Sequence, residues 1–186
     1  MKNKLVIFDC FGVIFDEVAS RFFRMHFDEE TARVLKDKFF VPADLGEITC
    51  EELFSGMAQE LGMKKEDILE EWNQLINIRP YMIKEIENIR EKADVALLSN
   101  APLGFVEKLF EENGITHLFD KIFISCNLKM AKPDPAIYLH CIASFNKEYE
   151  EIYMIDDSLF NVENLGEIGI IGVHFKDVSS LQQIKL

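Results

Sequence analysis

The 186-residue chain is poor in cysteine and contains no long hydrophobic stretch. Its cysteines, Cys10, Cys50, Cys126 and Cys141, show no paired spacing and no histidine cluster near them. This pattern excludes a disulfide framework and a cysteine–histidine zinc site, and it is typical of reduced thiols in the cytosol. No stretch approaches the ~18 apolar residues that a membrane-spanning helix requires. We therefore expect a cytoplasmic protein.

Basic residues are also scarce relative to acidic ones. The 20 Lys and Arg stand against 33 Asp and Glu, which gives a formal net charge of −13. This excess argues against nucleic acid or an anionic membrane as a partner, because both would be repelled. The acidic residues are not confined to a tail, so they mostly favour solubility. An anionic substrate would need a local metal ion or lysine, and the sequence does not determine the oligomeric state.

The chain does contain a series of short apolar runs. They cover residues 5–8, 95–98, 121–125, 152–155 and 170–175. Runs of this kind, without polar alternation, are typical of strands that are buried on both faces. Helical patterns lie between the last four runs, with expected starts near Pro102 and at Pro135. The helix from Pro102 is expected to end at Gly114, and another helix is expected to start at Pro80, before the second run. The alternation predicts an α/β fold with a parallel sheet.

The stretch between the first two runs is too long for a single crossover helix. Residues 16–79 contain several amphipathic segments of their own, and one of them begins with a capping box at Thr49. We expect an all-helical insert of about four helices above the carboxyl edge of the sheet. The remaining residues, 1–15 and 80–186, are then expected to form one catalytic core.

Polar side chains stand where four of the apolar runs end. They are Asp9, Ser99 with Asn100, Lys132 a few residues beyond the third run, and Asp156 with Asp157. The carboxyl ends of parallel strands meet at the edge where such sheets bind ligands. Taken singly, most of these residues have a structural interpretation as a helix cap or a surface charge. Asp9 is harder to interpret in that way, because a buried carboxylate without a partner is costly.

Taken together, these residues have the composition of a phosphoryl-transfer site. Asp9 supplies a nucleophilic carboxylate, and Ser99 supplies a hydroxyl next to backbone amides. Lys132 and those amides, helped by a helix N-terminus, can bind phosphate oxygens. Three carboxylates at one edge repel each other unless a cation lies among them, so Asp9, Asp156 and Asp157 predict a Mg²⁺ site.

The string VIFDCFGVIFD resembles the first motif of the haloacid dehalogenase superfamily. The strings LLSN, KPDPAIY and MIDDSLFN follow in the order and spacing of that superfamily over essentially the whole chain. The resemblance implies a Rossmann-like sheet ordered 5-4-1-2-3, with residues 16–79 as a helical cap. It also implies that Asp9 attacks phosphorus to give an aspartyl-phosphate. Mg²⁺ would be held by Asp9, the backbone carbonyl of Phe11 and Asp157, with Asp156 acting through water or an indirect contact.

One position departs from the pattern of the superfamily. Most of its phosphatases have a second aspartate two residues after the nucleophile, which protonates the leaving group and then activates water. This chain has Phe11 there, and loss of a general acid/base typically costs ~10²–10⁴ in rate. A branch of small members that resemble sugar-1-phosphate phosphatases also lacks an acid at this place. That branch implies Mg²⁺-dependent hydrolysis of a small phosphomonoester, with a sugar phosphate as the expected substrate.

Two other interpretations stay open. The first is a 2-haloacid dehalogenase, in which an aromatic residue commonly occupies this position and the nucleophile works without metal. The pair Asp156 and Asp157 speaks against it, because dehalogenases replace that pair with serine. The second is a catalytically weak or inactive regulatory protein that binds metal or phosphate, since Phe11 replaces the usual acid/base.

In enzymes that resemble this chain, the cap supplies selectivity for the substrate. The aromatic residues Phe22, Phe23 and Trp72 are expected to form the core of the cap, since large aromatic side chains in amphipathic helices are usually buried. Arg21 and Arg24 are candidates for substrate contacts, and each can equally be a solvated surface charge.

Overall fold

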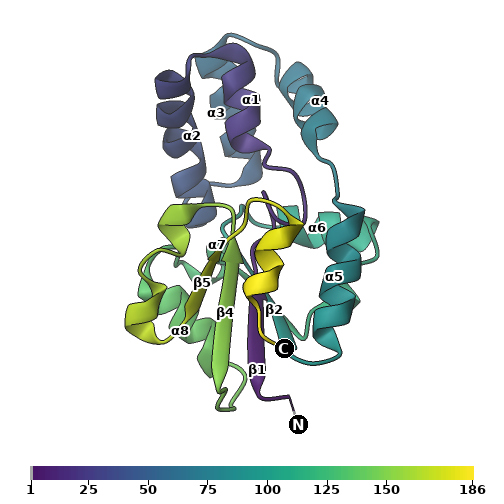
Figure 1. The fold of residues 1–186 in the computed structure, drawn as a ribbon. Helices are drawn as coiled ribbons and strands as arrows, with labels where there is room; N and C mark the ends of the chain where they lie inside the picture. The colour runs from purple at the N-terminus through teal and green to yellow at the C-terminus, as the bar shows by residue number, and fades with distance from the viewer. Residues whose placement is uncertain (1) are drawn as a thin grey trace.

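The computed structural model describes residues 2–186, and its centre is a parallel sheet of five strands (Figure 1). The strands are β1 (Lys4–Phe8), β2 (Asp94–Ser99), β3 (Lys121–Ile124), β4 (Glu151–Asp156) and β5 (Ile171–His174). Their order is β3-β2-β1-β4-β5, the expected order read from the other edge, so the predicted Rossmann-like fold is confirmed. In the central strand β1 the residues from Leu5 to Phe8 are fully buried, as expected for an apolar strand covered on both faces.

Helices cover both faces of the sheet. They are α5 (Pro80–Arg90), α6 (Phe105–Glu112), α7 (Ser125–Leu128), α8 (Pro135–Ala143) and the short 3-10 helices Thr116–Leu118, Leu159–Asn161, Leu165–Ile168 and Val178–Gln183. Apolar residues of α5, α6 and the C-terminal 3-10 helix share one buried cluster with the sheet, and those of α8 and Leu165 share another. None of the helices in residues 2–186 is long and apolar enough to cross a membrane.

Several expected element boundaries differ from the structure by a few residues, and two of these differences have a clear structural cause. The third strand ends at Ile124 rather than at residue 125, because Ser125 begins α7 and turns its hydroxyl toward the backbone of other segments. The helix expected from near Pro102 begins only at Phe105. Gly104 precedes it with φ of 75°, a left-handed conformation that cannot be part of a right-handed helix.

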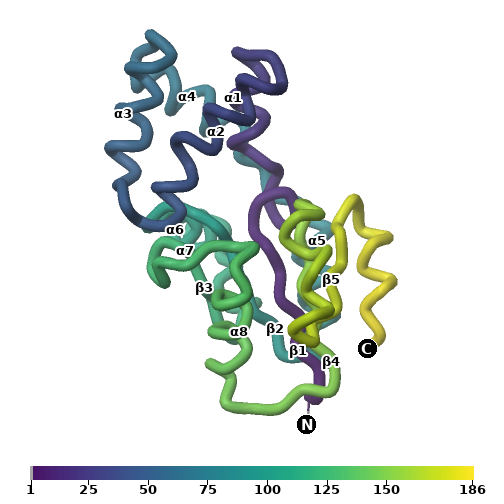
Figure 2. Tube along the Cα trace, turned by 90° about the vertical axis from the view of Figure 1, so that its left-hand side faces the viewer, coloured from purple at the N-terminus to yellow at the C-terminus, as the bar shows by residue number. Residues whose placement is uncertain are grey.

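Four helices between β1 and α5 form a separate layer beyond the carboxyl ends of the strands (Figures 1 and 2). They are α1 (Ala19–His26), α2 (Glu29–Asp44), α3 (Cys50–Leu61) and α4 (Lys65–Leu75). Their apolar faces enclose a buried cluster of their own, in which the ring of Trp72 stacks on Phe40 at 5.3 Å. Phe22 and Phe23 belong to the same cluster, so the prediction that these aromatic residues form the core of the insert is confirmed.

The two segments that connect the insert to the sheet run next to each other. The backbone N–H of Asp16 donates to the carbonyl of Asn77 at 2.9 Å, and that of Arg79 donates to the carbonyl of Ile14 at 2.8 Å. The Arg79 guanidinium joins the same place through its Nε, 3.1 Å from Asp16 Oδ1, and it also donates to the Gly12 carbonyl. We call these two adjacent segments, residues 14–16 and 77–79, the neck. Their contacts fix the place where the insert leaves the sheet.

Candidate active site

The three predicted carboxylates meet at the carboxyl edge of the sheet. Asp9 follows β1, Asp156 ends β4 and Asp157 comes next. Since β1 and β4 are paired neighbours, the Asp9 N–H donates to the Ile155 carbonyl at 2.9 Å. One oxygen from each of the three side chains lies within 4.8 Å of the others. The sheet register therefore produces the cluster that the sequence predicted.

Lys132 joins the cluster from the loop before α8. Its side chain is 1% exposed, and its Nζ lies 2.8 Å from Asp9 Oδ1 and 2.6 Å from Asp156 Oδ2. Asn100 holds this loop in place: its Oδ1 accepts from the Lys132 N–H at 2.9 Å, and its Nδ2 donates to the Lys132 carbonyl at 3.0 Å. The side-chain amide of Asn100 thus determines how far Lys132 extends into the site.

The three carboxylates differ in what already binds them. Asp156 is fully buried, and its oxygens accept from Lys132, from the Ser158 N–H at 2.8 Å and from Asn161 Nδ2 at 3.0 and 3.1 Å. The side chain of Asp157 accepts no hydrogen bond from any residue among 2–186. Asp156 therefore anchors Lys132 and the loop, while Asp157 is available to a ligand.

The charges of the cluster do not balance. Burial, together with Asp156 and Asp157, raises the pKa of Asp9 to about 8, although the charge of Lys132 acts in the opposite direction. Burial and the neighbouring Asp156 raise the pKa of Asp157 to about 6. Three carboxylates facing one ammonium leave an excess of negative charge in a partly dry site. Carboxylate oxygens are the donors that Mg²⁺ prefers, so the donor set fits a divalent cation.

Gly12 allows Asp157 to reach this position. Its φ is +80°, and a Cβ built on it would lie 2.1 Å from the carboxylate carbon of Asp157. Any side chain at this position would occupy the space of that carboxylate. Gly12 was not among the residues predicted for the site, although its place within the VIFDCFGVIFD string was an available signal.

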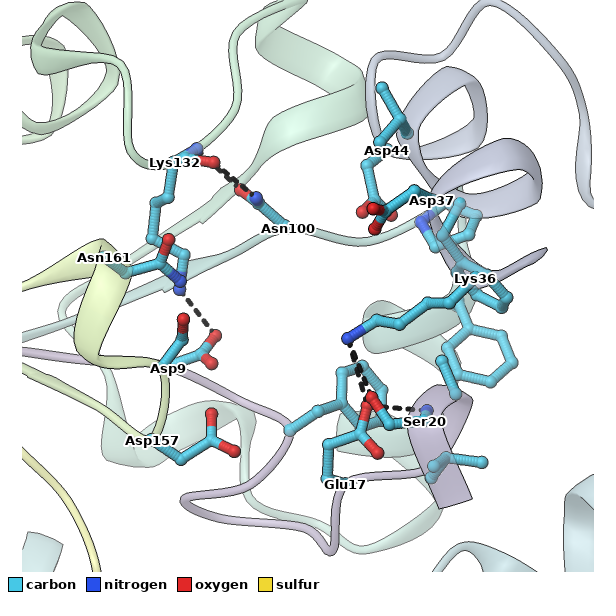
Figure 3. A pocket seen from close by; sticks show the side chains of 18 of the residues that line it. Asp9, Glu17, Ser20, Lys36, Asp37, Asp44, Asn100, Lys132, Asp157 and Asn161 are labelled. Carbon is cyan, nitrogen blue, oxygen red and sulfur yellow. Dashed lines mark hydrogen bonds and ion pairs between the residues drawn. The ribbon is translucent and has the colours of Figure 1, made fainter. Parts of the chain in front are cut away.

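A cavity of about 660 Å³ lies between the carboxylate cluster and the four-helix layer. Asp9, Lys132 and Asp157 line its sheet side, and Glu17, Ser20, Lys36, Asp37 and Asp44 line it from the insert (Figure 3). Its wall also includes the aromatic side chains of Phe11, Phe40, Phe54, Trp72 and Phe105. Trp72 thus belongs to both the core of the insert and the cavity wall.

Other candidate residues lie differently from the expectations. Arg21 and Arg24 do not line the cavity but pair with Asp16 at 3.1 Å and Glu29 at 3.7 Å. The insert cation that faces the cavity is Lys36 of α2, whose Nζ lies 3.0 Å from Ser20 Oγ. The choice between Arg21 and Lys36 depends on helix rotation, which the sequence pattern does not show.

Ser99 ends β2 directly before Asn100. Its hydroxyl is buried, and no residue among 2–186 forms a hydrogen bond with it. Asn100 rather than Ser99 lines the cavity. The substrate-binding role of Ser99 stays a prediction.

The parallel sheet, the cluster of carboxylates at the strand ends and the helical layer above it are the features of a class of hydrolases with an α/β fold and a helical insert. The chain belongs to the haloacid dehalogenase-like hydrolase family, whose model matches residues 3–169. The predicted superfamily and the predicted hydrolase class are therefore confirmed.

Relatives and solved structures agree with this assignment. The chain is 23% identical to the sesquiterpene phosphatase astK of Aspergillus oryzae, over 94% of this chain and 90% of that protein. The structure of the HAD family enzyme bt-2542 of Bacteroides thetaiotaomicron is similar with a TM-score of 0.80, 26% identity and 98% coverage of both chains. The same enzyme in complex with magnesium and inorganic phosphate gives a TM-score of 0.76 at 27% identity, covering 96% of this chain and 98% of that one.

A dehalogenase shares the fold as well. L-2-haloacid dehalogenase of Xanthobacter autotrophicus matches 96% of this chain and 80% of its own, with a TM-score of 0.65 and 18% identity. At that identity the similarity concerns the fold alone. The relatives that are more similar in sequence include the phosphatase and therefore support the phosphatase class.

Proposed function

We propose that this protein is a Mg²⁺-dependent phosphatase that hydrolyses a small phosphomonoester through Asp9. The observation that carries the proposal is the cluster of three carboxylates at the floor of the cavity, two of which pair with one buried lysine. A site with this charge excess attracts a divalent cation, and the cation in turn attracts a phosphate. The phosphatase astK and the magnesium–phosphate complex of bt-2542 support the same chemistry.

Within this proposal Asp9, the backbone carbonyl of Phe11 and Asp157 would hold the Mg²⁺, with Asp156 in an indirect contact. The bound cation would supply positive charge beside the nucleophile and the transferred phosphoryl group. Asp9 forms a bond to phosphorus as the bond to the leaving oxygen breaks, and water then releases phosphate from the aspartyl-phosphate.

The remaining residues of the site bind and orient the phosphate. Lys132 is held between Asp9 and Asp156, and those charges raise its pKa although burial lowers it, so it stays an ammonium. The hydroxyl of Ser99, the residue directly before Asn100, is buried and has no partner among residues 2–186, and we propose that it donates to a phosphate oxygen that binds at the end of β2. Asn100 fixes the Lys132 backbone and, with it, the distance between Lys132 and Asp9.

The groups that line the cavity suggest two substrate classes. A sugar phosphate is our first candidate, because Ser20 and Lys36 present hydrogen-bonding groups on the insert side. An isoprenoid monophosphate is the second, because Phe40, Phe54 and Trp72 form an aromatic wall and the relative astK is a sesquiterpene phosphatase. We further infer that residues 16–79 act as the cap that selects between them, over a core of residues 1–15 and 80–186.

The alternatives make different predictions. A haloacid would bring its own carboxylate next to Asp9 and Asp157, and without a cation the repulsion would oppose binding. A regulatory protein would bind Mg²⁺ and phosphate but would not turn over a substrate.

The deciding experiment is hydrolysis of a phosphomonoester panel with Mg²⁺ and with EDTA. The panel contains sugar 1-phosphates, sugar 6-phosphates and farnesyl monophosphate, and 2-chloropropionate is assayed for chloride release. We expect phosphate release that EDTA abolishes and Mg²⁺ restores. Asp9→Asn should lower kcat by a factor of at least ~10³, since it removes the nucleophile.

The matched control is Asp67→Asn, which neutralises an exposed aspartate of α4 outside the cavity wall and should leave kcat unchanged. Chloride release that is insensitive to EDTA would instead assign the chain to the dehalogenases. Mg²⁺ binding without any turnover would support the regulatory interpretation.

A further inference from the structure

The proposed phosphatase lacks a proton donor at the usual position, where the ring of Phe11 packs against Phe105 at 5.7 Å. An alcohol leaving group still needs a proton as the phosphorus–oxygen bond breaks. In-line displacement places the leaving oxygen on the side of phosphorus opposite Asp9. A substitute donor must therefore line the cavity on the side that faces Asp9, which is the side of the insert.

Three carboxyl groups outside the carboxylate cluster described above line the cavity: Glu17, Asp37 and Asp44. Glu17 is already engaged, because it accepts from the N–H of Ser20 at 3.0 Å and lies 3.4 Å from Lys36 Nζ. The side chain of Asp37 is 57% exposed to solvent and pairs with Arg33 at 3.8 Å. Neither group is suited to carry a proton to a substrate.

Asp44 has a different environment. It is the last residue of α2, and its Oδ1 is buried without a hydrogen-bond partner among residues 2–186. Figure 3 shows Asp44 and Lys36 on the insert side of the cavity, across from Asp9 and Asp157. Burial raises the pKa of Asp44 to about 7, and the charges of Lys36 and Lys132 lower it only in part. Its carboxyl group is therefore present in both protonation states near neutral pH.

The backbone of Asp44 is fixed to the catalytic core. The Ser125 hydroxyl donates to the Asp44 carbonyl at 2.6 Å, and its oxygen accepts from the Ala101 N–H at 3.0 Å. Ala101 directly follows Asn100, which positions Lys132. One buried hydroxyl thus connects the end of α2 to the loop that holds the lysine, so Asp44 keeps its place relative to Asp9 even though it belongs to the insert.

We propose that Asp44 is the general acid and base of this enzyme, supplied from the insert in place of the residue at position 11. In the first step an Asp9 oxygen bonds to phosphorus, the bond to the leaving oxygen breaks, and that oxygen takes the proton of Asp44. In the second step water attacks phosphorus and gives a proton to the Asp44 carboxylate. The Asp9–phosphorus bond then breaks, which releases inorganic phosphate and restores both side chains.

The test compares two leaving groups in the first turnover of Asp44→Asn, with Mg²⁺ present. The substrates are p-nitrophenyl phosphate, whose phenolate leaves without a proton, and the primary-alkyl phosphate that the wild type hydrolyses fastest. We expect phosphorylation by the alkyl substrate to slow by ~10²-fold or more, and phosphorylation by the aryl substrate by less than about threefold. A stoichiometric burst of nitrophenolate should appear, because the second step also lacks its base.

Asp37→Asn is the matched control, since it neutralises another cavity-lining carboxyl of the same helix. Asp37→Asn should change the phosphorylation rates with the alkyl and the aryl substrate by the same factor. Equal losses on both substrates for Asp44→Asn, or alkyl phosphorylation within about threefold of the wild type, would overturn the role of Asp44 while leaving the proposed phosphatase intact. The inference rests on that phosphatase, so a wild type inactive on every phosphomonoester would overturn both.

Discussion

Single residues decide the geometry of this site through the space they leave free. Gly12 is the clearest case, because the Asp157 carboxylate occupies the position where a Cβ would stand, with the built Cβ 2.1 Å from the carboxylate carbon. The carbonyl of Gly12 also accepts a hydrogen bond from the Arg79 guanidinium, which connects Gly12 to the neck of the insert. The backbone at Gly12 therefore has little freedom to move away. A side chain at this position would displace the Asp157 carboxylate.

We expect Gly12→Ala to weaken Mg²⁺ binding by ~10- to 100-fold, as is typical when the support of a metal ligand is altered. The measurement is titration calorimetry with Mg²⁺, accompanied by phosphatase assays. Gly114→Ala is the matched control, because Gly114 has a similar φ of +65° but nothing within 4 Å of its Cβ position. Equal Mg²⁺ affinities for the two variants would contradict the expectation that a side chain at position 12 displaces Asp157 and weakens the metal site.

At the scale of elements, two groups of hydrogen bonds help to hold the insert against the rest of the chain. One group lies in the neck, at Asp16 and Arg79. The other lies at the end of α2, where Ser125 Oγ donates to the Asp44 carbonyl and Lys129 Nζ donates to the Gly46 carbonyl at 2.7 Å. The Ser125 hydroxyl forms hydrogen bonds with both the end of α2 and the loop after β2. It therefore connects α7, α2 and that loop.

We expect Ser125→Ala to lower the free energy of unfolding by about 1–3 kcal/mol, since it leaves a buried N–H and a carbonyl without their partner. The check is urea denaturation followed by circular dichroism. Ser55→Ala is the control, because Ser55 is exposed on α3 and its hydroxyl donates to Glu51 at 3.2 Å, its sole side-chain partner among residues 2–186. A loss below about 0.5 kcal/mol for Ser125→Ala, the range of ordinary surface substitutions, would contradict this interpretation.

The sequence allows the sheet side of the site to be predicted, and the insert side far less. Asp9 and Asp156 each end an apolar run, so strand register alone brings them together. The wall above them depends on how α1 and α2 rotate against each other, and one-face spacing does not determine which cation points inward. For that reason Arg21 was named as a candidate, whereas Lys36 lines the cavity. Asp44 was missed because its environment arises from packing between segments distant in sequence.

At the scale of the whole molecule, the buried carboxyl groups of Asp9, Asp44 and Asp157 couple folding to pH. Burial raises the pKa of these groups to about 8, 7 and 6, well above their usual range when unfolded. Between those values and the ordinary pKa, the native state binds more protons than the unfolded state. Stability in the absence of metal therefore falls as pH rises through this window. A cation that binds the ionised cluster opposes the fall.

We expect the unfolding free energy of the metal-free protein to fall by several kcal/mol between pH 5 and pH 8, because each raised pKa contributes about 1.4 kcal/mol per pH unit. Mg²⁺ should raise the melting temperature more at pH 8 than at pH 5, because at the lower pH protons compete for the same oxygens. Thermal melts at both pH values, with EDTA and with Mg²⁺, measure this. Asp157→Asn should flatten the pH dependence and reduce the gain from Mg²⁺, since it removes one of the titrating ligands. A gain from Mg²⁺ that is the same at both pH values would show that the cation binds away from the cluster.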